Sequence, residues 1–318
     1  MMPAPGAFAR DRTTDMPIRY DIAHTTVYRY RQPVTFGEHR VMFRPRDSHD
    51  QRVIATDLDV SPAADVRMIQ DPHSNSVALV QPRQPAAELR IVCSFTIEHA
   101  HSMNLELPLS PSAESYPFAY SIDERLDLEH YLRPYYDDPD GVVAAWARGF
   151  IRTDGPTATR DLLVHMNHAI RGHFRYVARE EEGTQSPVET LARGSGSCRD
   201  FALLMMEASR RLGIASRFVS GYLYDPTLDA PAGNRPAPPN DGEHVVGAGF
   251  THAWMQAYLP GAGWVPFDPT NNLLGGTQLI RVGVARDPAQ AAPVAGSWFG
   301  QTGDYLGMDV SVTVRRRR

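Results

Sequence analysis

Short runs of alternating apolar and polar residues occupy the first third of the chain, and turn residues separate them. Such runs predict β-strands. They cover residues 18–30, 36–43, 52–60, 77–80 and 89–97. Several short strands in succession are typical of an all-β domain, and we predict a β-sandwich for residues 17–102.

The last of these runs places one cysteine in the core of the predicted sandwich. Successive side chains of a strand point to opposite faces, so residues of one parity share a face. The residues of one parity here are Leu89, Ile91, Cys93, Phe95 and Ile97. Because that face is apolar, we expect Cys93 to be a buried and unreactive thiol.

The pattern changes after the predicted sandwich. Residues 103–145 are rich in Pro, Tyr and Asp and follow no clear period, so we interpret them as a linker packed along the surface. Helical spacing then begins with Leu162, Met166 and Ile170. We therefore predict a disordered tail over residues 1–16 and a second domain over residues 146–318.

One helix of the second domain carries the candidate chemistry. Its apolar stripe runs from Phe201 to Leu212, and Gly213 is placed to end it. The helix follows a Gly/Ser-rich stretch, so Cys198 lies at its N-terminus. The unpaired N–H groups of a helix N-terminus favour the reactive thiolate form of cysteine. Three strands are predicted next, over residues 216–224, 251–259 and 264–268, and a long loop, 225–249, separates the first two.

A cysteine nucleophile needs a base within hydrogen-bond reach and a third group that orients the base. The last two predicted strands form a hairpin. If its turn is centred near Pro260 and Gly261, His252 and Asp268 become direct cross-strand partners, close enough for the carboxylate to hold one imidazole nitrogen. Each residue alone also fits a structural role: a helix-start cysteine, a strand histidine, and an aspartate that forms a turn. The occurrence of all three together favours a catalytic triad.

Other polar residues are better explained structurally. Asp200 lies in the first turn of the same helix, where a carboxylate stabilises the N-terminus, and substrate placement is its second interpretation. His165 and His168 are spaced i, i+3 on a helix but lack companion ligands at metal-site spacing. No phosphate-binding glycine loop occurs. We therefore expect neither a metal nor a cofactor.

Composition limits the classes of binding partner and the cellular compartment that we expect for the protein. The 318 residues carry a net charge of −5, which argues against a nucleic-acid-binding protein and favours a protein or peptide substrate. All 32 basic residues are arginine, so no lysine can form a Schiff base. No apolar run is long enough to span a bilayer, and residues 315–318 are interpreted as a solvated basic tail. We expect a cytoplasmic protein without a membrane partner; its oligomeric state is not predicted.

Several motifs together resemble the core of bacterial transglutaminase-like proteins. They are Gly194-Ser195-Gly196-Ser197-Cys198-Arg199-Asp200-Phe201-Ala202, Gly213-Ile214-Ala215-Ser216-Arg217-Phe218, His252-Ala253-Trp254, Gly263-Trp264 and Asp268-Pro269-Thr270-Asn271. The N-terminal part is similar to the β domain that precedes this core in the family. The motifs there are His24-Thr25-Thr26-Val27-Tyr28-Arg29-Tyr30 and Arg44-Pro45-Arg46, with Gln51 and residues 71–75.

The resemblance implies an α+β protein, in which an N-terminal β-sandwich precedes a papain-like, transglutaminase-like core. It also implies that Cys198 is the nucleophile, that His252 is the general base and then acid, and that Asp268 orients the imidazole. The expected activity is cleavage of peptide or carboxamide bonds through a thioester, and we favour hydrolysis over transfer to an amine. The alternatives are transglutaminase-type acyl transfer, a non-catalytic peptide-binding module, and an arylamine acetyl-transferring enzyme.

Overall fold

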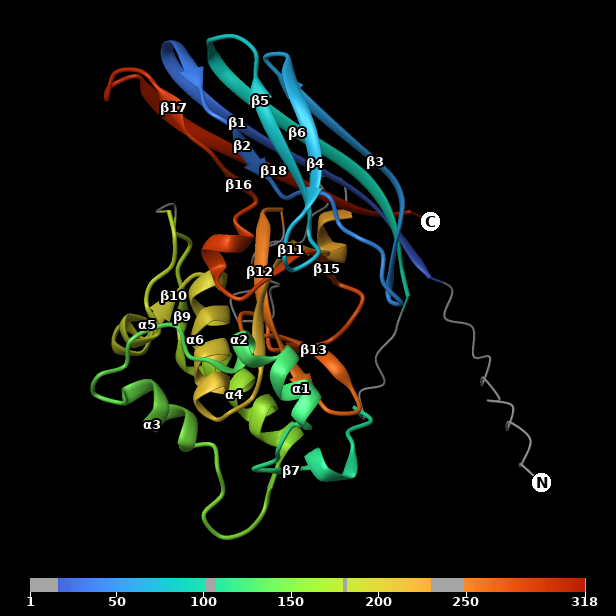
Figure 1. Cartoon of the computed structure of the whole chain (residues 1–318), viewed down its shortest axis with the longest axis vertical. Coiled ribbons are helices and arrows are strands. Elements are labelled where there is room, and N and C mark those ends of the chain that lie inside the picture. Colours follow the sequence, from blue (N-terminus) through green and yellow to red (C-terminus); the bar gives the residue numbers. More distant parts are fainter. Residues whose placement is uncertain (1–16, 101–106, 180–181, 230–248, 318) are drawn as a thin grey trace, which may run out of the picture.

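Two parts make up the molecule (Figure 1): long strands form one, and helices around a second sheet form the other. The computed structural model describes residues 17–100, 107–179, 182–229 and 249–317. The predicted tail 1–16 lies outside the described residues. The α+β prediction is confirmed, because the first part contains only strands and the second contains both helices and strands.

The strand-rich part, called here the β domain, is a sandwich of two antiparallel sheets. One sheet has the order β17-β1-β6-β3, with β18 also paired to β1, and the other has the order β16-β2-β5-β4. Their bounds are β1 Ile18–Phe36, β2 His39–Val41, β3 Gln51–Ser61, β4 Ala64–Gln70, β5 Ser76–Pro82, β6 Ala86–His99, β16 Val294–Ala295, β17 Trp298–Phe299 and β18 Tyr305–Arg317.

Alternation along the central strand β6 supplies much of the sandwich core, as predicted. Its inward residues from Leu89 to Ile97 are all buried, and Cys93 among them is 1% exposed. The sequence prediction missed β4, whose residues are exposed or only half-buried along its length. Val66 and Met68 alternate with the polar Asp65 and Arg67, but Ile69 ends the alternation, so the signal is short.

The C-terminal end of the chain corrects the predicted domain boundary. Residues 294–317 were assigned to the second domain, whereas β16, β17 and β18 belong to the sheets of the β domain. Strand β18 pairs with β1 from Arg317 opposite Arg19 to Tyr305 opposite Tyr30. Only Val312 and Val314 of β18 are buried. The alternation of apolar and polar residues from Met308 to Val314 is a strand signal, but it does not show which sheet the strand joins.

The predicted linker is also more structured than its composition indicates. It contains η1 (Pro111–Ala113), β7 (Ser115–Tyr116), α1 (Ile122–Asp127), α2 (Glu129–Leu132) and the start of α3 (Val142–Arg148). Leu128 and Tyr131 are buried against Ala215 of the second part. The first helix begins with a capping box in which Ser121 and Glu124 exchange hydrogen bonds. The segment therefore belongs to the second part and is not a simple connection.

The second part, called here the core domain, is built on a sheet of order β14-β13-β12-β11-β15. The bounds are β11 Ser216–Leu223, β12 Thr251–Leu259, β13 Gly263–Asp268, β14 Leu273–Leu274 and β15 Leu279–Ala285. Helix α6 (Cys198–Arg211) packs on this sheet, beside α4 (Thr159–His173) and α5 (Pro187–Arg193). The remaining short elements are β8 Thr157–Ala158, β9 Arg175–Tyr176, β10 Ser195–Gly196, η2 Pro226–Asp229 and η4 Pro288–Ala291. Most of the predicted loop 225–249 lies outside the described residues.

Helix α6 is the centre of this domain. Its residues from Asp200 to Arg210 are all buried, and its apolar side chains form one cluster with Met255 and Phe267 of the sheet. The predicted C-terminal stop is confirmed, since Gly213 adopts a left-handed φ of 74°. Burial on all sides fixes the position of the helix N-terminus relative to the sheet.

The hairpin of β12 and β13 corrects the predicted register. Met255 pairs with Phe267, which centres the turn on Gly261, whereas direct pairing of His252 with Asp268 requires a centre on Pro260. His252 and Asp268 are therefore not directly opposed, and the prediction was wrong by two residues. Because a shift of two leaves every side chain on its original face, the pair remains on one face as diagonal neighbours.

The two domains share a continuous interface. Tyr222 of β11 and Ile280 of β15 are part of the apolar cluster that fills the sandwich. The side chain of Asn75 in the β domain bonds to the backbone of Val284 as a neighbouring strand would. Its Nδ2 donates to the Val284 carbonyl at 2.7 Å, and its Oδ1 accepts from the Val284 N–H at 2.9 Å. Apolar burial and backbone pairing thus fix the core sheet against the sandwich.

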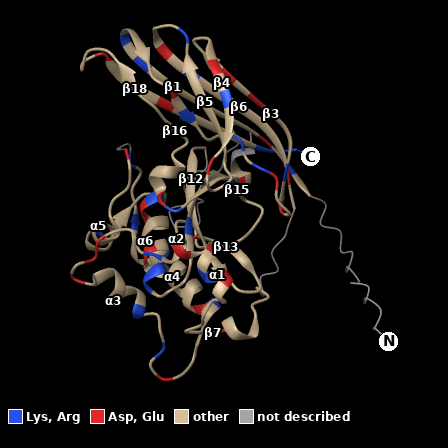
Figure 2. Cartoon of the chain, viewed as in Figure 1, with Lys and Arg blue, Asp and Glu red and all other residues tan. Residues whose placement is uncertain are grey.

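Charged residues are mixed by sign over both domains (Figure 2). Within the described part of the chain, no helix has the length and apolar character needed to cross a membrane.

Candidate active site

The segment before Cys198 is shaped by close backbone contacts. Gly194 ends α5 with a left-handed φ of 56°, and β10 then pairs in parallel with β9. A Cβ atom at Gly196 would lie 2.8 Å from the Cβ of Asp200. Only glycine fits at that position, so the Gly/Ser-rich sequence sets the path by which the chain enters α6.

Asp200 holds this entry in place. Its carboxylate accepts hydrogen bonds from the N–H of Ser197 at 2.8 Å and of Gln185 at 2.7 Å, and from Arg179 at 2.9 Å. Burial alone would raise the pKa of Asp200, but the hydrogen bonds from Ser197 and Gln185 outweigh it and lower the pKa. The predicted stabilising role at the helix N-terminus is confirmed by this capping box.

The structure brings His252 and Asp268 into direct contact. His252 Nε2 lies 2.8 Å from Asp268 Oδ2, and both side chains are fully buried. Asp268 also accepts from the N–H of Thr270 at 2.9 Å and from Asn271 Nδ2 at 2.8 Å. A carboxylate held from three directions gives the imidazole one orientation.

Cys198 is the third member of this cluster. Burial alone would lower the pKa of His252, but Asp268 and then Cys198 reverse the effect and raise the pKa to about 10. His252 Nδ1 is buried and accepts or donates no hydrogen bond within the described residues. One nitrogen is therefore committed to the carboxylate, and the other is available to a thiol that is itself 8% exposed.

Two neighbours of the cluster were not predicted as site residues. Trp254 stacks beside His252 with ring centroids 6.0 Å apart, and burial followed by the charge of Cys198 raises the pKa of Tyr176 to about 12. The position of Trp254 two residues after His252 on one strand was a readable signal, because such residues share a face. Tyr176 is brought near through the pairing of β9 with β10, which no local pattern shows.

The two helical histidines do not join the cluster. His165 and His168 are exposed on α4, and His168 Nδ1 lies 3.2 Å from Asn272 Nδ2. No group of His, Cys, Asp or Glu residues within the described ranges has an arrangement that could hold a metal ion.

A cysteine at a helix N-terminus, with a histidine held by a buried carboxylate on the adjacent strand, is an arrangement compatible with thiol chemistry. Two family models match this chain. The bacterial transglutaminase-like N-terminal region matches residues 20–98, and the transglutaminase-like superfamily matches residues 144–269. The chain therefore carries a region similar to the transglutaminase-like superfamily, preceded by one similar to the bacterial N-terminal region.

Similar proteins extend over almost the whole chain. An uncharacterized protein of Mycobacterium leprae is 29% identical over 93% of this chain and 98% of its own length. One from Mycobacterium tuberculosis is 27% identical over 96% of each. A crystal structure of a candidate cysteine protease from Cytophaga hutchinsonii has a TM-score of 0.66 at 19% identity, covering 94% of this chain and 91% of that chain. The last comparison shows a shared fold.

Proposed function

We propose that Cys198, His252 and Asp268 form a catalytic triad that cleaves peptide or carboxamide bonds through a thioester. The family and the fold support a thiol enzyme in general. The observation that carries the specific proposal is the hydrogen bond of 2.8 Å between His252 and Asp268. Two further observations support it: His252 Nδ1 has no hydrogen-bond partner among the described residues, and Cys198 contributes to the raised pKa of His252.

The proposed reaction has two stages. The Cys198 thiolate attacks the carbonyl carbon, and the negative charge moves to the carbonyl oxygen, for which the Cys198 N–H at the start of α6 is a candidate donor. As the carbon–nitrogen bond breaks, the His252 imidazolium gives its proton to the departing amine. A water molecule then loses a proton to His252 and attacks the thioester, which releases the acid and the thiol.

Hydrolysis is proposed as the principal outcome, ahead of transfer to an amine. A transferase must bind the incoming amine and keep water from the thioester, and an acidic side chain is the usual partner of an ammonium group. Among the described residues, the two buried carboxylates of this site are already committed: Asp200 caps α6, and Asp268 holds the imidazole. Water needs no such partner.

Mass spectrometry of peptide substrates tests the proposal. The wild-type protein is incubated with a glutamine-containing peptide library, with and without a saturating primary amine, and Cys198→Ala serves as the matched control. Free acid should dominate at every amine concentration, and the control should form no product. Dominant amine adduct would replace hydrolysis by acyl transfer. Absence of both products, with peptide still bound, would instead identify a binding module.

A further inference from the structure

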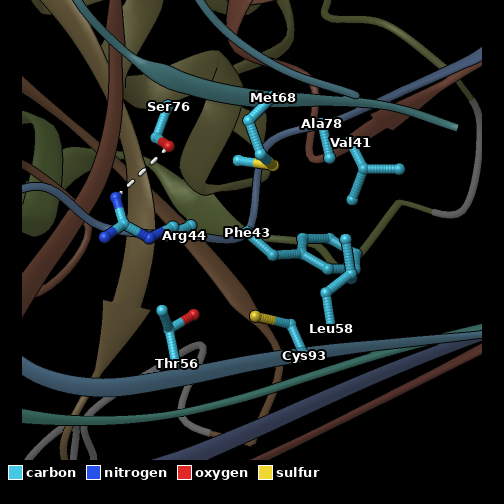
Figure 3. Close-up of a pocket in the computed structure, with 9 residues that line it drawn as sticks. All are labelled: Val41, Phe43, Arg44, Thr56, Leu58, Met68, Ser76, Ala78 and Cys93. Atoms are coloured by element: carbon cyan, nitrogen blue, oxygen red, sulfur yellow. Dashed lines mark hydrogen bonds between the residues drawn. The ribbon is translucent and has the colours of Figure 1, made fainter. Parts of the chain in front are cut away.

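A cavity of about 380 Å³ lies between the two sheets of the β domain, on the side where β3 and β4 form the sheet edges. Figure 3 shows its lining. Most of the lining side chains are apolar, and the full set is Val41, Phe43, Arg44, Thr56, Leu58, Met68, Ser76, Ala78 and Cys93. This volume lies within the range of small-molecule sites in proteins.

The sandwich is open to solvent at this edge. Val66 and Met68 of β4 lie opposite Val80 and Ala78, which are buried, so all four side chains face inward. Val66 and Met68 nevertheless remain 46% and 49% exposed. Inward-facing apolar residues of a closed sandwich are normally covered by the opposite sheet. The exposure of this pair therefore marks an entrance beside Met68.

Arg44 gives the cavity a charged end. Its Nη1 donates one long hydrogen bond to Ser76 Oγ, at 3.4 Å, and no carboxylate of the described residues forms an ion pair with it. The same guanidinium acts on Cys93 across the cavity: burial raises the pKa of Cys93 to about 11, and Arg44 opposes that shift. Figure 3 shows Arg44 and Ser76 on one side, and Val41 and Leu58 on the other.

We propose that this cavity binds a small amphiphile with one carboxylate and an unbranched apolar chain, such as a medium-chain fatty acid. The carboxylate pairs with Arg44, and the chain lies along Phe43 and Leu58 toward the far wall. A single guanidinium selects one anionic group, because a cation would be repelled and an uncharged chain would leave the arginine without a counter-charge. The site is independent of the proposed triad, which lies in the other domain.

Calorimetric titration of the full-length protein with decanoate tests the charge requirement. Decanoate should bind with one-to-one stoichiometry below its critical micelle concentration, whereas decanol and decyltrimethylammonium should bind at least about tenfold more weakly, as expected from loss of one charge-assisted hydrogen bond. Equal binding of all three would overturn the proposal. Binding of an apolar peptide with a free C-terminal carboxylate, but not of decanoate, would overturn it as well.

Two arginine variants locate the site. Arg44→Met should weaken decanoate binding by on the order of tenfold. Arg67→Met is the matched control, because Arg67 is the neighbour of Met68 on β4, is exposed, and points to the opposite face. The control should bind like the wild type. Equal losses in the two variants, or unchanged binding in Arg44→Met, would contradict the assignment.

A thiol-protection measurement does not depend on an arginine variant. The chain has two cysteines, so Cys198→Ala leaves Cys93 as the only thiol, on the cavity wall. Saturating decanoate should slow the reaction of Cys93 with a maleimide at least about tenfold, because the ligand would have to leave before the reagent enters. An unchanged rate at saturation would place decanoate elsewhere and refute the site.

Discussion

Each domain contains one buried cysteine and a histidine that is almost fully buried, His24 or His252, and their different surroundings separate an inert pair from a candidate catalytic one. His24 of the β domain and His252 of the core domain are both 1% exposed. Burial lowers the pKa of His24 to about 3, since its ring bonds only to the hydroxyls of Tyr222 and Thr26. The pKa of His252 is raised to about 10, because Asp268 and Cys198 overcome the effect of burial.

The two cysteines differ in the same way. Cys93 lies on an apolar strand face, and burial raises its pKa to about 11. Cys198 begins a helix, and it contributes to the raised pKa of His252. The comparison teaches that residue type and burial do not define a reactive site. A buried carboxylate with its own hydrogen-bond donors makes the difference: Asp268 bonds to His252, whereas His24 bonds to no carboxylate among the described residues.

The largest effect should come from removing each sulfur in turn. Cys198→Ala should lower amidase turnover by on the order of 10⁴-fold or more, since no other group can form the thioester. Cys93→Ala should keep turnover within about twofold and lower the free energy of unfolding by about 1 kcal/mol, because it removes only a packed side chain. Comparable turnover in the two variants would remove the distinction between the cysteines.

Asp268→Asn tests the carboxylate itself. The amide fits the same space but does not stabilise an imidazolium, so turnover should fall by on the order of 10³- to 10⁴-fold while circular dichroism stays native. The pH profile should also change, because the pKa of His252 falls without its charged partner. Wild-type turnover in a folded variant would exclude Asp268 from the triad.

Alkylation compares the two thiols within one molecule. Limited iodoacetamide at neutral pH should label Cys198 at least ~10-fold faster than Cys93, since the thiolate is the reacting form and burial in an apolar strand face suppresses it. Peptide mapping by mass spectrometry measures both rates in the same sample. Preferential labelling of Cys93 would reverse the assignment.

The two histidines should destabilise the protein at opposite ends of the pH range. The folded pKa of His252 is raised, so its contribution is complete below about pH 6.5 and is lost as the pH rises toward 10. The folded pKa of His24 is lowered, so its contribution is present above pH 6.5 and is lost as the pH falls toward 3. Urea unfolding should show a loss of about 2–3 kcal/mol between pH 7 and 9.

A matched variant identifies the source of the alkaline loss. His252→Gln should flatten the stability profile between pH 7 and 9 and leave the acidic side unchanged. An unaltered slope in His252→Gln would attribute the loss to another group.

The smallest effect on turnover concerns the interface partner of His24. Tyr222→Phe removes the hydroxyl that lies 2.7 Å from His24 Nδ1, which leaves one buried ring nitrogen without its partner. The free energy of unfolding should fall by about 1–3 kcal/mol, with turnover unchanged. Loss of turnover at native stability would show that the domain interface acts on the site.

The sequence predicted the elements of the site better than their contacts. Helix α6 and strand β12 lie where the apolar periods indicated, because both have strongly patterned buried faces. The hairpin register was off by two residues, since the turn chemistry around Gly261 allows more than one centre. Because the error was two residues, His252 and Asp268 still lie on the same face of the sheet, and their side chains still form a hydrogen bond.

Features that depend on distant segments could not be predicted. Strand β18 has few buried residues, and its place is set by the free edge of β1. The cavity exists because two sheet edges stay apart beside Met68, and no local pattern encodes that separation. In the sequence Arg44 is part of a family motif, and its lack of an acidic partner among the described residues emerges only from the fold.

The pairing of β1 with β18 also affects how the protein folds during synthesis and how its two domains can be separated. Twelve residue pairs join the first described strand to the last, so a nascent chain cannot finish this sheet until almost the whole sequence has left the ribosome. Pairing over such a separation slows folding. A truncated product ending after β15 would expose the edge of β1, which is a template for aggregation. A separate β domain is better obtained by excising the core domain and joining β6 to β16 through a flexible linker.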